Sequence, residues 1–256
     1  MSYKLVKMDK DNRKELSVLI KSMEKDIFYP LGEDFFKIDH GEDYFAFFER
    51  LGELHYWCVF DKDKLIAVAA GVIRDFENNK KSWYLCDLKV IKEYRGKRIP
   101  QFIFKRAFIY NLLNHRVFRA YAVSMNSEDK TLPFHKIKRA TLNLLKVKET
   151  LNIYNFNFND VELVKTFDDF VLTNTKGKKE LILKSNKERM DLFHFTKNKT
   201  LETKEEPSKD SIIMLSAFNN DFVDEKLKAL SRTPDSTATV LTFRMPFLTS
   251  IFTDEI

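Results

Sequence analysis

The sequence predicts an α/β (α+β) protein: a mixed, mostly antiparallel central sheet flanked by helices, followed by a small C-terminal β-α-β lobe. One observation is that alternating apolar and polar residues, typical of strands, recur along the chain. A second is that stretches with apolar residues at helical spacing separate these runs. The third is the composition of the 256 residues, 44% hydrophobic and 32% charged, which supplies a core and argues against global disorder.

The elements up to residue 125 are expected in the order strand, helix, helix, three strands, helix, strand. Two of the strands flank a polar turn at residues 61–64, which predicts a hairpin. Residues 27–39 are expected to form a loop, because Pro30 interrupts an aromatic run. Pro100 suits the beginning of a helix, since its φ is fixed and its missing N–H is not needed there. The expected strands are residues 2–8, 55–60, 65–76, 82–90 and 116–125, and the expected helices are residues 11–23, 42–51 and 100–114.

The second half of the chain has weaker patterns. A helix with a basic face is expected over residues 132–145. Charged and polar residues dominate 186–209, which predicts a linker or an exposed loop. Further strands are expected at residues 152–167, 168–174 and 178–185, and a strand, a helix and a strand at residues 212–218, 221–232 and 237–245. The predicted domain limits are 1–185 for the main domain, 186–209 for the linker and 210–256 for the lobe.

The formal net charge is +6, from 44 basic and 38 acidic residues. This balance suits an anionic ligand, a nucleic acid or a membrane surface, and does not decide among them. No apolar run approaches the ~20 residues that span a bilayer, and the N-terminus has no apolar signal region. We therefore expect a cytoplasmic protein with no membrane partner.

The cysteines and histidines do not predict a metal site. Cys58 and Cys86 lie in expected strands without CxxC spacing, which predicts reduced core residues rather than a disulfide or zinc site. The histidines show no metal-binding spacing and are interpreted as structural or surface residues. These histidines are His40, His55, His115 and His194.

The segment DLKVIKEYRGKRIP, residues 87–100, places a basic turn with one glycine between a buried strand and a helix. Backbone N–H groups of such a turn and of a helix N-terminus bind phosphate well, because they are otherwise unpaired and the helix dipole is positive there. Arg95, Lys97 and Arg98 add positive charge. The segment therefore predicts a site for a phosphate group.

With the order of elements, this segment resembles the GNAT family of acyl-CoA-dependent N-acetyltransferases. The family pattern is a strand ending L-x-V, four residues, and then R/Q-x-x-G-x-G/A opening a helix. The residues that carry the resemblance are Leu88, Val90, Glu93, Tyr94, Arg95, Gly96 and Lys97. The resemblance covers residues 1–165 in element order and implies a GNAT-like domain within 1–185 that uses acetyl-CoA as co-substrate.

The resemblance also implies roles for individual residues. The pantetheine arm of acetyl-CoA would pair with the end of the strand where it splays from its neighbour, and a backbone N–H there would stabilise the oxyanion. Asp87, which alternation places on the opposite face from Cys86, is the candidate for the base or for holding a cationic amine. The residues alone favour equally an aspartate paired with Lys89 or Arg119. The cofactor-binding residues implied are Leu88, Lys89, Val90, Arg95, Gly96, Lys97, Arg98, Ile99 and Asn126.

The sequence departs from the family pattern at three positions. Arg98 stands in place of the second glycine, and Pro100 in place of the last small residue, where it removes one N–H donor. The family's tyrosine acid is expected about seven residues after Asn126, where this chain has Pro133. Tyr121 and His135 are therefore the candidates for the acid that protonates the leaving thiolate.

Three functions stay open, and the first is favoured. The first is an acetyl-CoA-dependent N-acyltransferase in which an amine of a small molecule or peptide attacks the thioester directly. The second is a non-catalytic GNAT-fold binding protein, which the altered loop favours. The third is a nucleic-acid-binding protein, which the basic charge permits although no RNA or DNA motif is present. A homodimer through an exposed sheet edge or through the lobe is compatible with each of them.

Overall fold

The computed structural model describes residues 3–31, 34–76, 80–126, 133–160, 167, 170–197 and 199–245. The chain forms two compact units, each assembled from separated segments. Unit 1 comprises Met1–Lys25, Phe48–Lys148 and Thr239–Leu248, and unit 2 comprises Asp26–Phe47, Glu149–Ala238 and Thr249–Ile256. The domain limits predicted from the sequence follow the chain linearly, whereas these units do not.

The sheet of unit 1 has the strand order β1-β4-β5-β6-β7. The first three pairings are antiparallel, and β6 pairs with β7 in parallel, as a crossover through a helix requires. The strands are β1 (Lys4–Lys7), β4 (Glu53–Asp61), β5 (Lys64–Phe76), β6 (Lys80–Val90) and β7 (Ala120–Met125). The helices are α1 (Arg13–Glu24), α3 (Ile99–Asn114) and α4 (Pro133–Ala140), and a 3-10 turn, η2 (Lys92–Tyr94), precedes α3.

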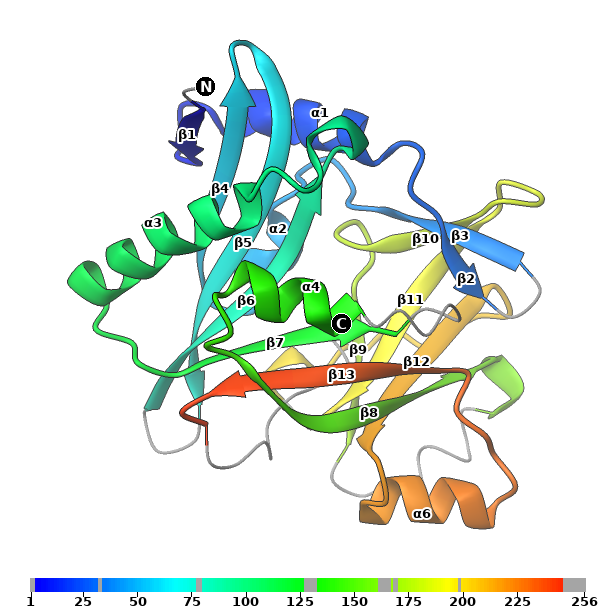
Figure 1. The fold of residues 1–256 in the computed structure, drawn as a ribbon. Helices are drawn as coiled ribbons and strands as arrows, with labels where there is room; N and C mark the ends of the chain where they lie inside the picture. The colour runs from blue at the N-terminus through cyan, green and yellow to red at the C-terminus, as the bar shows by residue number, and fades with distance from the viewer. Residues whose placement is uncertain are drawn as a thin grey trace. The chain divides into compact units, whose positions relative to one another are not determined.

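Helices cover both faces of this sheet. In Figure 1, α3 lies on the near side of β4 and β5, and α1 lies on their far side. Ile99 and Ile103 of α3 pack on Val59 and Ile66, and all four side chains are at most 2% exposed. On α1, Ile20 is completely buried. The apolar faces of both helices therefore fix the sheet that carries the β6–α3 turn.

Unit 2 contains strands that run in mixed directions. Its β12, β11, β10, β3 and β2 follow one another, and β9 also pairs with β11. The pairing of β11 with β12 is parallel and the other described pairings are antiparallel. The elements are β2 (Tyr29–Leu31), β3 (Asp34–Asp39), η3 (Phe158–Asp160), β9 (Val171–Asn174), β10 (Glu180–Leu183), β11 (Arg189–Thr196), η4 (Lys199–Leu201), β12 (Ser211–Phe218) and α6 (Phe222–Ala229).

Three further elements contain the points where the chain passes from one unit to the other. These are α2 (Ala46–Glu49), β8 (Lys146–Phe156) and β13 (Ser236–Phe243). The apolar core of unit 2 is aromatic-rich and includes Tyr154, Phe156, Phe193, Phe195 and Leu215. The many phenylalanines of the sequence therefore serve packing here.

The predicted fold class is confirmed: the structure is mixed α/β with mostly antiparallel strand pairing. The hairpin around residues 61–64 is confirmed by the pairing of Asp61 with Lys64. The predicted strand, helix and strand of the final segment are confirmed as β12, α6 and β13. The helices predicted over 42–51 and 132–145 are shorter, and end at Glu49 and Ala140. Within the described ranges, no helix is long and apolar enough to cross a membrane.

Two predicted loops contain strands, so these predictions were wrong. Within the first of them, Tyr29–Leu31 form β2 and Asp34–Asp39 form β3, and β3 pairs with β10, a partner far away in sequence. Pro30 is compatible with this hairpin because it lies in the short strand β2, which is last in the strand order and pairs with β3. In the predicted linker 186–209, Arg189–Thr196 form β11, whose Leu192 and Phe193 are buried. The charged flanks of that segment concealed a short apolar strand.

Candidate active site

The turn between β6 and α3 contains two left-handed backbone positions. Gly96 has a φ of +82° and Arg98 a φ of +58°. A Cβ at Gly96 would meet nothing within 4 Å, so the glycine is favoured there by its backbone conformation and not by lack of space. Arg98 is the N-cap residue of α3, and Ile99, which follows, is only 1% exposed. The buried Ile99 therefore anchors the N-terminus of a 16-residue helix next to the turn.

Basic side chains surround this helix N-terminus. Arg95, Gly96, Lys97 and Arg98 are all exposed. The Nε of Arg95 donates to the Val90 carbonyl at 3.2 Å, and the Lys97 ammonium lies 4.2 Å from the centre of the Tyr94 ring. Cations next to the positive end of a helix dipole are unfavourable by themselves. The arrangement is therefore suited to an anion.

Strand β6 pairs with β7 over a short stretch. The described register pairs are Trp83 with Ala120 and Tyr84 with Tyr121, whereas β6 continues along β5 as far as Val90. No register pair between β6 and β7 is described past Tyr84. The described register pairs of β6 past Tyr84 are thus with β5 alone.

A β-bulge explains this geometry. Lys89 pairs with Val68 and Cys86 with Ala70, so three steps along β6 face two steps along β5. Asp87, with a φ of +52°, lies in the bulge. A bulge bends the strand and increases its twist, which directs the end of β6 away from its neighbour. It also ends strict alternation past Cys86, so the face assigned to Asp87 from the sequence pattern does not hold.

Asp87 lies in a buried ionic cluster. Its side chain is 5% exposed and pairs with Lys89, whose ammonium also lies 2.7 Å from Glu24 of α1. The Tyr56 hydroxyl donates to the other carboxylate oxygen of Asp87. Burial lowers the pKa of Lys89, and the nearby Glu24 carboxylate opposes this shift. Lys89 and Arg119 were the partners considered for Asp87 from the sequence, and the structure pairs Asp87 with Lys89.

The two candidate acids have different environments. Tyr121 is completely buried in β7, stacked on Tyr84 with ring centres 4.8 Å apart. Its hydroxyl accepts a hydrogen bond from Nη1 of Arg74 at 2.5 Å. His135 is exposed on α4, beside Phe134. Only the tyrosine lies on a strand that pairs with β6.

The remaining cofactor-binding candidates lie at the strand end and after β7. Leu88 is 39% exposed, and Val90 packs at the edge of the cluster formed by Ile99 and Val59. Asn126 follows β7, and its Oδ1 accepts from the Thr239 hydroxyl at 2.9 Å. The loop and strand-end residues are therefore grouped around the β6–α3 turn, while Asn126 has a structural partner from a distant segment.

The sequence did not identify three residues that contact the predicted ones. They are Tyr56, Glu24 and Arg74, which bind Asp87, Lys89 and Tyr121 respectively. No local motif marks them. The hairpin register that opposes Tyr56 to Ala70 gives a partial indication, but the bulge in β6 hides the further step to Asp87.

Known proteins share this fold. The family model for the acetyltransferase (GNAT) family matches residues 22–134. A solved tandem GNAT protein from the clavulanic acid biosynthesis pathway is 9% identical with a TM-score of 0.54, over 94% of this chain and 98% of that chain. Arabidopsis thaliana NAA60, solved with a bisubstrate analogue, is 12% identical with a TM-score of 0.41, over 59% of this chain and 87% of that chain. A putative acetyltransferase from Thermoplasma acidophilum is 13% identical with a TM-score of 0.42, over 74% of this chain and 78% of that chain. No curated protein matches the chain.

Proposed function

We propose that this chain, whose residues 22–134 match the family model of the GNAT acetyltransferases, transfers an acetyl group from acetyl-CoA to an amine of a small molecule or peptide. The observation that carries the proposal is the combination of two features at one turn. The end of β6 bulges and has no described register pair with β7 past Tyr84, and the basic N-terminus of α3 follows directly. An extended arm ending in a pyrophosphate is the ligand that fits both.

The cofactor is proposed to bind along β6 and at the turn. Backbone groups of Leu88, Lys89 and Val90 would pair with the amides of the pantetheine arm. The pyrophosphate would lie against the turn from Arg95 to Ile99, where first-turn N–H groups of a helix have no intrahelical partner. Arg98 supplies charge where the family has glycine, which offsets the N–H that Pro100 lacks.

The reaction is proposed to be direct attack of the amine on the thioester. The amine nitrogen bonds to the acetyl carbon, the C–S bond breaks, and the products are an amide and the thiol of CoA. A backbone N–H in the bulge would stabilise the oxyanion. Asp87 would take the proton that the amine loses, and Tyr121 would give its hydroxyl proton to the thiolate. Asp87 then loses the proton that it took up and the Tyr121 phenolate regains one, so that both groups return to their starting states.

The ion pair between Asp87 and Lys89 restricts the proposed role of Asp87 as the base. Lys89 already places an ammonium group on the Asp87 carboxylate, as an acceptor amine would. Asp87 would therefore act on the acceptor only if it shares its carboxylate between Lys89 and the substrate. Tyr121 is preferred to His135 as the acid, because Tyr121 lies in the strand paired with β6 and His135 is exposed on α4.

A non-catalytic GNAT-fold binding protein is the second candidate. The observation that favours it is that the Asp87 carboxylate already accepts a hydrogen bond from Tyr56 and forms an ion pair with Lys89. Under this alternative the cofactor binds, or has been lost, and no thiol is released with any amine. Release of CoA with any amine in a thiol assay excludes the alternative.

The deciding experiment is isothermal titration of the full chain with acetyl-CoA, desulfo-CoA and ATP. Acetyl-CoA and desulfo-CoA are expected to bind much more tightly than ATP, because ATP lacks the arm that pairs with β6. Arg95→Ala and Gly96→Trp are each expected to weaken the binding of both CoA compounds. Absence of binding by either CoA compound, or equal binding by the wild type and both variants, contradicts the proposal.

A further inference from the structure

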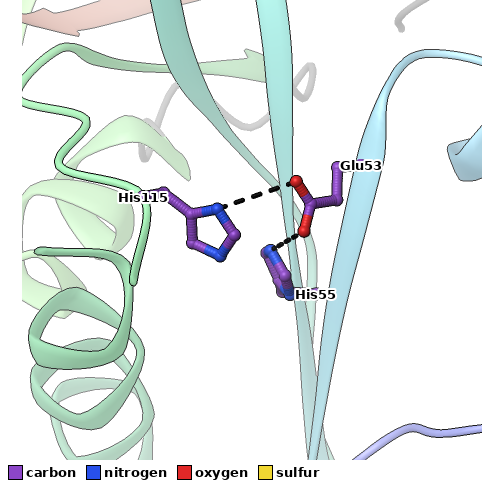
Figure 2. A group of neighbouring side chains, drawn as sticks. All are labelled: Glu53, His55 and His115. Carbon is purple, nitrogen blue, oxygen red and sulfur yellow. Dashed lines mark ion pairs between the residues drawn. The ribbon is translucent and has the colours of Figure 1, made fainter. Parts of the chain in front are cut away.

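A second group of chemically capable side chains lies at the start of β4 and the end of α3. Glu53 is the first residue of β4 and His55 follows two residues later, so both side chains are on one face of the strand. His115 is the C-cap residue of α3. Figure 2 shows the three side chains converging, and one ligand atom from each lies within 4.8 Å of the others. The fold thus brings together two histidines that the sequence pattern indicates to be structural or surface residues.

The carboxylate of Glu53 lies between the two imidazoles. Its Oε1 is 3.3 Å from Nε2 of His55, and its Oε2 is 3.6 Å from Nδ1 of His115. The side chains of His55 and His115 are 7% and 14% exposed, whereas that of Glu53 is 56% exposed. The nitrogen atoms are therefore inside, and the carboxylate reaches them from the surface, which leaves a route for an ion to enter.

The imidazoles lack hydrogen-bond partners. Among the residues that the structure describes, both ring nitrogens of His55 and Nε2 of His115 are buried without one. Such burial is unfavourable unless something else satisfies the nitrogen atoms. A bound metal ion would satisfy these buried nitrogen atoms, because an imidazole nitrogen that carries no proton is a metal ligand.

The surroundings contain one favourable and one unfavourable charge. His115 ends α3, and the carbonyl groups at a helix C-terminus favour a cation. The Lys7 ammonium repels one, since both carry positive charge. The Lys7 ammonium donates to the Tyr110 hydroxyl at 2.6 Å, which holds it near the cluster. We expect the repulsion from Lys7 to lower the affinity for a metal ion without preventing binding, because the helix C-terminus favours a cation.

We propose that Glu53, His55 and His115 bind a divalent transition-metal ion of the zinc class. Two imidazole nitrogens and one carboxylate oxygen form a donor set that Zn²⁺ accepts, with the remaining position open to water. Mg²⁺ and Ca²⁺ prefer oxygen donors, so they are expected to bind poorly. The ion would tie the start of β4 to the end of α3.

This site is separate from the candidate active site and does not depend on the proposed acyl transfer. Glu53 opposes Ile73 of β5, whereas the end of β6 opposes Ala67 and Val68. Five to six residues of extended strand separate these positions by roughly 15–20 Å. The inferred role is to stabilise unit 1, and not to take part in chemistry at the thioester.

The experiment uses the full chain without a histidine tag, treated with a chelator and dialysed. Titration with ZnCl₂ is expected to show one strong site, MgCl₂ none, and the melting temperature is expected to rise with added zinc. Cobalt(II) is expected to give visible absorption bands that report its nitrogen ligands. Glu53→Gln and His115→Gln should each weaken zinc binding by more than the ~10–100-fold that loss of an outer-shell partner costs.

Matched variants separate a built site from general charge effects. Glu15→Gln removes an exposed carboxylate from α1 and is expected to leave zinc binding unchanged. Lys7→Met removes the repelling charge and is expected to strengthen it. If His115→Gln does not fold, Glu53→Gln still decides, because the Glu53 side chain is mostly exposed. No zinc binding, or equal binding by the wild type, Glu53→Gln and Lys7→Met, overturns the proposal.

Discussion

Both units contain two parallel strands joined by a crossover, and the two crossovers differ. In unit 1, the basic turn and the 16-residue α3 connect β6 to β7. In unit 2, residues 197–210 connect β11 to β12, and within their described part the regular structure is the short η4. A helix N-terminus that can receive a phosphate is therefore a feature of the first crossover.

The strand pairs differ as well. β11 pairs with β12 from Asp191 to His194, and its last residues pair with β9. The described pairing of β6 with β7 ends at Tyr84, ahead of the bulge at Asp87. Two parallel strands are thus not enough for the kind of cofactor site that is proposed for unit 1. The bulge and the helix after it distinguish unit 1.

Unit 2 instead places a charged group inside a polar network. The Asp224 side chain is completely buried, and it accepts from the Tyr154 hydroxyl, the Asn152 amide and the Lys228 ammonium. In unit 1 the basic residues of the turn are exposed. The difference indicates that the polar residues of unit 2 stabilise its fold, while those of the turn are available to a ligand.

The largest expected effect is a charge reversal in the unit 1 crossover. Arg95→Glu combined with Arg98→Glu is expected to weaken acetyl-CoA binding by about 100-fold or more, because hydrogen bonds to charged groups contribute about 1.5–3 kcal/mol each. Isothermal titration measures the change. Lys199→Glu with Lys204→Glu, in the unit 2 crossover, alters the net charge equally and is expected to have little effect. A similar loss in both double variants would mean that overall charge, and not the turn, binds the cofactor.

The next effect concerns the acid stability of unit 2. Burial raises the pKa of Asp224, but hydrogen bonds from Lys228, Tyr154 and Asn152 outweigh this and lower it from 3.8 to about 2. A depressed carboxyl pKa stabilises the fold above the unfolded-state value and loses that contribution as the pH falls through the folded-state value. Unit 2 is therefore expected to lose about 2 kcal/mol of stability between pH 4 and pH 2.

Hydrogen exchange of the β8 and β12 amides as a function of pH tests this. Asp224→Asn is expected to be less stable than the wild type at neutral pH. Its stability is expected to depend less on pH between pH 4 and pH 2. Acetyl-CoA affinity at neutral pH is expected to stay unchanged, provided that the variant is folded. An unchanged pH dependence in Asp224→Asn would show that another group controls the transition.

The turn was predictable from the sequence because its signals are local. A strand, a glycine with basic neighbours and a helix-starting proline follow one another within residues 87–100. The buried partners of Asp87 and the meeting of His55 with His115 depend on strand register and on where α3 ends, which no local pattern specifies. The same applies to β3 and β11, whose partners lie in distant segments.

A smaller effect is expected from the backbone at Arg98. Its φ of +58° is the left-handed conformation that costs a non-glycine residue about 1–2 kcal/mol. Arg98→Gly is expected to raise the free energy of unfolding in urea by up to about 1 kcal/mol. The gain is smaller than the full strain energy because glycine increases the conformational entropy of the unfolded chain. The same variant is expected to weaken acetyl-CoA binding, because it removes a cation.

Lys187 of unit 2 offers the matched control. It is exposed and has a φ of +64°. Lys187→Gly is expected to gain a similar amount of stability without a change in acetyl-CoA affinity. If Arg98→Gly instead binds acetyl-CoA more tightly, close backbone approach matters more at this position than the charge of Arg98.

The smallest expected effect is at Lys97. Its ammonium lies over the Tyr94 ring, and the side chain is exposed. Exposed ion pairs contribute about 0.2–1 kcal/mol, so Lys97→Met is expected to weaken acetyl-CoA binding by about two- to fivefold. The difference should vanish at 1 M salt, where the screening length is about 3 Å. Lys204→Met is the control in the other crossover and is expected to bind normally. A loss as large as that of the double arginine variant would make Lys97, and not the arginines, the main phosphate contact.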